Sequence, residues 1–284
     1  MKYYLLNILS AVLLGLFLAS CSELDSNISQ PQPLTVHKEG VVTPGHANFH
    51  GNLIRENGWD MTLCQTCHAK DFSGGTANAT CNNCHTSAGG PTACNTCHGS
   101  FANPSRIAPP TDLENNTSSS VLGVGAHTKH LYENTLGERA RCGSCHIFPS
   151  SLYAESHMDN DGRAEVVLKN LAVAHGADNA SYNAEDGSCS NTYCHGNFEF
   201  YRDSALAKDQ FVYTEDKMVG NMASVKWTDS GTPECGSCHG LPPTGHKAYP
   251  MSSCYTCHGE VIDENGNIID KTKHINGLIE ARGN

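Results

Sequence analysis

The sequence predicts a mostly irregular chain with few short helices and one small hairpin, a chain that cannot build a core from its own side chains. Beyond residue 20, only 42 of 264 residues are Leu, Ile, Val or Phe, and the formal charge is −12. That composition is normally typical of disorder. The same stretch nevertheless contains 14 cysteines beyond Cys21, and they lie in closely spaced pairs. Something other than side chains must therefore supply the apolar interior.

The first twenty residues have the features of an export signal. Lys2 is followed by a short uncharged apolar run from Leu5 to Leu18, which is too short for a comfortable membrane span. Residues 18–21 resemble the lipobox of bacterial lipoproteins, so we expect cleavage before Cys21 and acylation of its thiol. The alternative is an ordinary signal peptide with an incidental cysteine. Ser22, by the same resemblance, favours the outer membrane. No later stretch is long and apolar enough to span a bilayer, and the acidic charge argues against nucleic acid as a partner.

The 14 cysteines form seven pairs, each followed directly by histidine. Six pairs have two intervening residues: Cys64, Cys67 and His68; Cys81, Cys84 and His85; Cys94, Cys97 and His98; Cys142, Cys145 and His146; Cys235, Cys238 and His239; Cys254, Cys257 and His258. The seventh has four: Cys189, Cys194 and His195. C-x-x-C-H is the attachment motif of c-type haem, in which two thiols bond the porphyrin vinyl groups and the histidine becomes the proximal iron ligand. We therefore predict seven covalently bound haems c, packed together, as the core of the fold.

Disulfides, redox-active cysteine pairs and zinc sites are the alternatives to this interpretation. None of them requires histidine directly after the second cysteine, and no cysteine is left over except Cys21. The wider Cys189–Cys194 spacing is the least regular of the seven.

Nine further histidines could supply the distal iron ligands. Their number favours bis-histidine, low-spin, low-potential haems, because methionine ligation raises the potential. His37, in a linker, and His175 are the two to set aside. The candidate distal ligands are then His46, His50, His127, His130, His157, His246 and His274.

The motifs and linkers divide the chain into segments. These are the signal at 1–20, a tether at 21–45, a three-haem segment at 46–100, a linker at 101–120, a two-haem module at 121–199, an insertion or loop at 200–230 and a second two-haem module at 231–284. The three motifs in 46–100 are so close together that conventional helices or a sheet have no room.

Short stretches predict the few local elements. His127 and His130 should lie on one face of a helical turn, where they could ligate two neighbouring irons; the alternative is one ligand and one bystander. Residues 165–168 suggest a short strand, and Asn265-Gly266 between two apolar pairs predicts a small hairpin. Residues 159–162 weakly resemble a calcium loop but are better interpreted as a plain turn.

Taken together, residues 121–284 resemble the multihaem outer-membrane cytochromes of metal-respiring bacteria, in the family named for its C-x-x-x-x-C-H and C-x-x-C-H pair. The matching segments are 125–131, 142–149, 157–162, 189–196, 238–246 and 274–277. The resemblance implies that His127, His130, His157, His246 and His274 occupy recurrent non-motif positions. It further implies an outer-membrane or cell-surface location, extracellular electron transfer, and cytochromes or a porin–cytochrome conduit as partners.

Two other functions compete with electron transport. A reductase acting on an oxyanion would need one open iron, yet all seven motifs end in histidine and spare histidines remain. A polymerised cytochrome filament would conflict with a lipid tether at Cys21. The sequence therefore favours an electron carrier over an enzyme.

Overall fold

The computed structural model describes residues 36–103, 105–108, 111–133, 135–155, 157–159, 163–229, 231 and 233–281. Its chain divides into two compact units, Met1–Glu56 and Asn57–Asn284. The signal segment, Cys21 and the first part of the tether lie outside the described residues.

In the first unit, a series of turns leads into helix α2 (His50–Glu56). The amide of Thr43 donates to the Gly40 carbonyl and the amide of His50 to the Val41 carbonyl, at 2.9 and 2.8 Å. Gly40 has φ +87°, and a Cβ there would lie 2.2 Å from the His46 ring. The turn therefore requires glycine, both for its left-handed backbone and for the imidazole packed on it.

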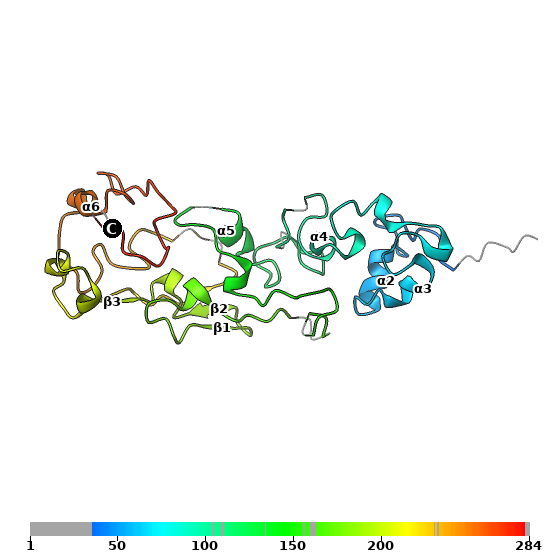
Figure 1. Cartoon of the computed structure of the whole chain (residues 1–284), viewed down its shortest axis with the longest axis horizontal. Helices are drawn as coiled ribbons and strands as arrows, with labels where there is room; N and C mark the ends of the chain where they lie inside the picture. The colour runs from blue at the N-terminus through cyan, green and yellow to red at the C-terminus, as the bar shows by residue number, and fades with distance from the viewer. Residues whose placement is uncertain are drawn as a thin grey trace, which may run out of the picture. The chain divides into compact units, whose positions relative to one another are not determined.

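The helices of the second unit are short (Figure 1). Most of them coincide with a cysteine motif. They are α3 (Thr62–His68), α4 (Cys94–Cys97), α5 (His127–Leu131) and α6 (Met251–His258). Single 3-10 turns cover Gly75–Ala77, Cys81–Asn83, Gly90–Thr92, Cys142–Ser144, Asn170–Val173, Tyr193–His195, Arg202–Ser204 and Gln210–Val212. Helices this short are marginal by themselves, so their stability must come from what they pack against.

Two small antiparallel sheets complete the second unit. Strands β1 (Ser181–Asn183), β2 (Ser188–Ser190) and β5 (Val225–Lys226) form one sheet in the order β1-β2-β5. Strands β3 (Glu199–Tyr201) and β4 (Lys217–Val219) form the other, with Phe200 opposite Met218. Residues 200–230, expected to be an insertion or loop, are thus more ordered than predicted. They contain strands β4 and β5, which pair with β3 and β2, although the segment has neither cysteine nor histidine.

Some of the local elements predicted from the sequence are confirmed and one is wrong. The helical turn at His127 and His130 is confirmed as α5. The hairpin at 261–269 is present as one antiparallel bridge between Ile262 and Ile268, with Gly266 at φ +81°. The strand at 165–168 is wrong, because this extended segment bonds to a motif backbone and not to a strand: the amide of Val167 donates to the Cys145 carbonyl at 2.8 Å. Residues 160–162 of the predicted turn lie outside the described residues.

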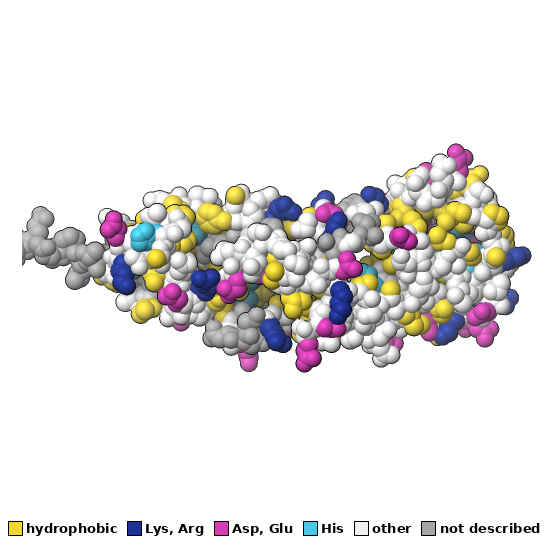
Figure 2. All heavy atoms as spheres, turned by 180° about the vertical axis from the view of Figure 1, so that it is seen from behind, with side chains coloured by type: hydrophobic (Ala, Val, Ile, Leu, Met, Phe, Trp, Pro, Cys, Tyr) yellow, Lys and Arg dark blue, Asp and Glu magenta, His cyan; other side chains and the backbone are white. Residues whose placement is uncertain are grey.

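The interior of the described residues is thin. Only eleven hydrophobic side chains are buried, four of them alanines, and among the described residues no large side chain is completely enclosed. Apolar side chains are instead spread over the visible face in Figure 2. Within the described ranges, no helix has the length and apolarity needed to cross a membrane. The predicted fold class, mostly coil with few short helices and little sheet, is confirmed.

Candidate functional site

Five of the six two-residue motifs place cysteine and histidine on a single helical turn, whereas the Cys235–Cys238 motif forms a non-helical turn in which Gly236 has φ +90°. The amide of the motif histidine donates to the carbonyl of the first cysteine at 3.1 Å for His85, 2.9 Å for His98 and 2.9 Å for His146. Residues three apart on such a turn are neighbours. Both thiols are therefore brought to one side, with the imidazole directly after them, which is the arrangement that attachment to two vinyl groups needs.

The four-residue motif is built differently. Cys189 is a residue of the central strand β2, paired with Tyr182 on β1 and Val225 on β5. Cys194 lies in the following 3-10 turn, Tyr193–His195. A strand rises about 3.3 Å per residue, so it carries its cysteine away from the turn more quickly than a helix would. The wider spacing thus reflects a strand-to-turn junction.

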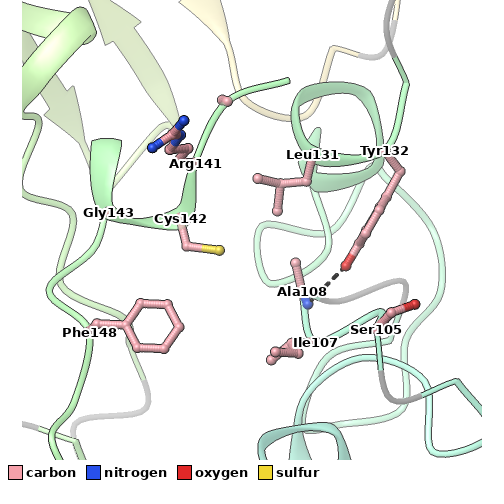
Figure 3. Close-up of a pocket in the computed structure, with 10 residues that line it drawn as sticks. Ser105, Ile107, Ala108, Leu131, Tyr132, Arg141, Cys142, Gly143 and Phe148 are labelled. Atoms are coloured by element: carbon pink, nitrogen blue, oxygen red, sulfur yellow. Dashed lines mark hydrogen bonds between the residues drawn. The ribbon is translucent and has the colours of Figure 1, made fainter. Parts of the chain in front are cut away.

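None of the fourteen motif cysteines forms a disulfide within the described residues. Figure 3 shows the Cys142 thiol pointing into a cavity of about 400 Å³, between Leu131 on one side and Phe148 on the other. Ile107 adds a further apolar wall, and the Tyr132 hydroxyl accepts from the Ala108 amide at 3.2 Å. A thiol that opens into an apolar cavity of this size fits the edge of a porphyrin.

The histidines share one hydrogen-bond pattern. In most of them Nδ1 lies against a backbone carbonyl, a contact that places the proton on Nδ1 and leaves the Nε2 lone pair for a metal. Among the motif histidines these contacts are His68 to Ala79, His146 to Glu165, His239 to Gly240 and His258 to Glu280, at 2.7–3.0 Å. Among the others they are His50 to Val41, His127 to Val124, His130 to Ala126, His157 to Leu152, His246 to Lys247 and His274 to Leu136, at 2.6–3.0 Å.

Four motif histidines each face a non-motif histidine at nearly the same spacing. The ring centroids are 6.1 Å apart for His98 and His157, 6.2 Å for His127 and His146, 6.0 Å for His130 and His195, and 6.3 Å for His239 and His274. The structure thus brings His127, His130, His157 and His274 to motif histidines. The distal roles assigned from sequence to His46, His50 and His246 stay predictions.

Burial keeps several of these imidazoles neutral. It lowers the pKa of His127 and of His195 to about 4, with smaller contributions from neighbouring histidines. Burial also lowers the pKa of His98 and His274. Neutral imidazole is the form that binds iron, so at neutral pH the rings are ready to act as ligands.

His46 and His175 make contacts of another kind. The Nδ1 of His46 accepts from the Asn48 amide at 3.1 Å, which places the proton on Nε2. The Nε2 of His175 lies 2.5 Å from the Gly277 carbonyl, so that nitrogen is already engaged. Setting His175 aside agrees with this contact, and the distal role of His46 stays a prediction.

Sequence reasoning missed the residues that support the ligands. Trp227 lies 4.7 Å from the His127 ring and 5.5 Å from the His130 ring, and its indole N–H donates to the Leu122 carbonyl. The Tyr193 hydroxyl accepts from the Gly277 amide at 3.1 Å, beside the His175 contact. No motif marks these residues, because their roles depend on segments about a hundred positions away in the sequence.

The described donors fit haem c. Each motif offers two thiols for thioether bonds and an imidazole for the iron, and when bound the haem supplies a one-electron centre. Four of the motif histidines also face a second imidazole, which could act as the other ligand of an iron. The chain's own part is to place these groups and to exclude water.

One family model matches the chain. Residues 188–239 match the Geobacter CxxxxCH...CXXCH motif family. No curated protein and no solved structure matches the chain. The matched range contains the strand-to-turn motif of Cys189 and Cys194 and ends at the motif histidine His239. Residues 188–239 are therefore a multihaem c-type cytochrome domain, and the molecule that contains them is an electron carrier with covalently bound haem c.

Proposed function

We propose that this chain is a heptahaem c-type cytochrome lipoprotein that carries electrons at the outer membrane or cell surface, in extracellular electron transfer. The observation that carries the proposal is a shared contact: Nδ1 lies on a backbone carbonyl in motif and non-motif histidines alike. Bis-histidine ligation gives low-spin, low-potential irons. An electron carrier needs no open coordination site, so histidines prepared on both sides of the iron favour carriage over reduction of an oxyanion.

The count of seven comes from the seven cysteine pairs, each ending in histidine. The distal ligands that we propose are those that the sequence favours: His46, His50, His127, His130, His157, His246 and His274. Replacing His46 with Ala should open one haem to carbon monoxide, while His37→Ala should open none.

The location rests on the lipobox-like segment that ends at Cys21. Acylation there would tether the chain, and other cytochromes or a porin–cytochrome conduit are the partners that this placement favours. Cys21→Ser should release the protein from membranes into the soluble fraction without loss of haem. Retention of the variant in the membrane would contradict the anchor.

Intact mass together with a haem spectrum tests the proposal directly. The native protein should weigh as much as residues 21–284 plus lipid and seven haems, and its reduced form should be low-spin with no carbon monoxide binding. A mass equal to the lipidated polypeptide, or a colourless product, would overturn the heptahaem assignment. Carbon monoxide binding to a large fraction of the haem would favour the reductase, and filaments in micrographs of purified protein would favour the polymer.

A further inference from the structure

The spacing of the four histidine pairs matches the distance between two imidazoles that bind the same metal ion. An imidazole nitrogen binds a first-row metal at about 2.0–2.1 Å, and the ring centroid lies just over 1 Å behind it, so two rings across one metal have centroids about 6.3 Å apart. The four observed spacings lie between 6.0 and 6.3 Å. Direct ring stacking would be closer, and each of the four pairs joins one motif histidine to one non-motif histidine.

The backbone also aims these rings. In the α5 pairs, Val124 and Ala126 hold the Nδ1 atoms of His127 and His130 through carbonyls of the preceding turn. Trp227 packs against both rings and fixes them relative to each other. Since the two histidines are three positions apart, one short helix can serve two irons at once.

Contacts between motifs show that the four sites follow one another. Gly196, directly after His195, has φ +91°, and a Cβ there would lie 1.9 Å from the Cys238 carbonyl oxygen. The backbones of these two motifs therefore touch. The Nδ1 of His274 lies 2.6 Å from the Leu136 carbonyl, in the segment between α5 and Cys142. Ile107, which lies nine residues after His98, lines the same cavity as Cys142, so the segments of those two motifs are neighbours as well.

From these observations, and resting on the proposed heptahaem function, we propose that the four ring pairs are the axial ligands of four successive haems. His157 completes the iron of the Cys94–Cys97 haem, His127 that of the Cys142–Cys145 haem, His130 that of the Cys189–Cys194 haem and His274 that of the Cys235–Cys238 haem. Two of the ligands come from beyond a neighbouring motif. His157 follows the Cys142–Cys145 motif, and His274 follows the Cys254–Cys257 motif. The four haems form one continuous series, and α5 supplies one ligand to each of the two irons in the middle of that series.

The ring planes divide the series into two halves. The interplanar angle is 34° for His98 and His157 and 26° for His127 and His146. It is 65° for His130 and His195 and 69° for His239 and His274. Nearly parallel imidazoles act on the same iron d orbital and split the pair that nearly perpendicular imidazoles leave almost degenerate. The ferric protein should therefore show two rhombic and two large-g low-spin signals from these haems.

Crossed variants test the pairing. His157→Ala should make one reduced haem bind carbon monoxide while all seven haems remain attached, because attachment needs only the motif. In a Cys94→Ser/Cys97→Ser background, which lacks the proposed partner haem, His157→Ala should add no carbon monoxide binding. In a Cys142→Ser/Cys145→Ser background it should still add one equivalent. The reverse result would overturn this pairing, and the same design applies to the other three.

Methionine variants cover the case in which a background does not fold. A thioether keeps the iron six-coordinate and raises its potential. His127→Met should raise the potential of one haem and remove a rhombic signal, whereas His130→Met should raise one potential and remove a large-g signal. Loss of the opposite signal class in either variant would refute the assignment. Fewer than seven haems or an open iron in the wild type would instead contradict the proposed function, before any variant is compared.

Discussion

In the second unit, residues 61–103 and residues 170–246 both carry cysteine motifs, but they build their interiors from different groups. The first range carries three motifs between Cys64 and His98 and has no strand, and its only buried residues are Met61, Phe72, Gly74, Pro91, Ala93 and Asn95. The second carries two motifs and adds both sheets, with Tyr193, Tyr213 and Met218 buried. It also contains a run of aromatic contacts that joins His175, Phe200 and Phe198, with centroids 4.6 and 5.1 Å apart.

The difference shows that the number of residues per haem decides how much of the interior the polypeptide itself can supply. Where motifs are separated by about ten residues, turns are all that the chain can form, and the porphyrins must supply the interior. Where the separation is longer, the polypeptide adds strands and aromatic packing of its own. Local stability should therefore depend on haem more strongly in 61–103 than in 170–246.

The largest expected effect is loss of all haem. Produced without haem attachment, the chain should show no cooperative thermal transition by circular dichroism, in both regions, because too little apolar surface is buried to offset the conformational entropy. A compact haem-free chain that melts cooperatively would contradict the prediction that the porphyrins form the core. Partial order confined to 170–246 would sharpen the comparison.

Removing one haem from each region comes next. Cys81→Ser/Cys84→Ser should make residues 61–103 sensitive to limited proteolysis throughout, whereas Cys235→Ser/Cys238→Ser should leave the β1-β2-β5 sheet protected. Mass spectrometry of the fragments gives the cleavage sites. Equal sensitivity of the two regions in the two variants would contradict the comparison.

A smaller effect is expected at the clamp that His175 and Tyr193 form on Gly277. His175→Phe keeps an aromatic ring in place but loses the contact to the Gly277 carbonyl, and a typical hydrogen bond contributes about 0.5–1.5 kcal/mol. The melting temperature should fall by about 2–4 °C per kcal/mol in a unit of this size. The haem of Cys235 and Cys238 should bind some carbon monoxide, because His274 lies three residues before Gly277. Tyr193→Phe is the matched variant for the Gly277 amide, and no effect from either would show that the clamp does not position His274.

The smallest effect is expected at Trp227. Trp227→Phe preserves a ring beside His127 and His130 and removes only the indole N–H bond to the Leu122 carbonyl, at a cost of about 1 kcal/mol or less, since the site is partly exposed. Calorimetry should show a shift of a few degrees at most, with the spin state unchanged. Trp227→Ala, which removes the packing as well, should broaden the low-spin signals of the two α5 haems. Identical spectra for the Phe and Ala variants would show that the ring does not orient the ligands.

Local features were predictable where local geometry decides them. The i and i+3 spacing of His127 and His130 predicted α5, and Asn265-Gly266 predicted the turn at Gly266. The strand at 165–168 failed because alternation of apolar residues cannot distinguish a strand from an extended segment bonded to a motif. None of the strands β1 to β5 was predicted, since each is only two or three residues long, and β3, β4 and β5 depend on partners elsewhere in the chain.

By itself, the sequence determined the chemistry of this protein: paired thiols followed by histidine bind haem c whatever surrounds them, because attachment takes place within five to seven consecutive residues. Only the tertiary structure decided which histidine faces which motif. His98 and His157 are 59 positions apart, and His130 and His195 are 65 apart. Whether an imidazole can bind iron depends on the carbonyl that its Nδ1 meets and on the ring across from it. Both are set by segments brought together in space, so counting histidines could give their number but not their partners.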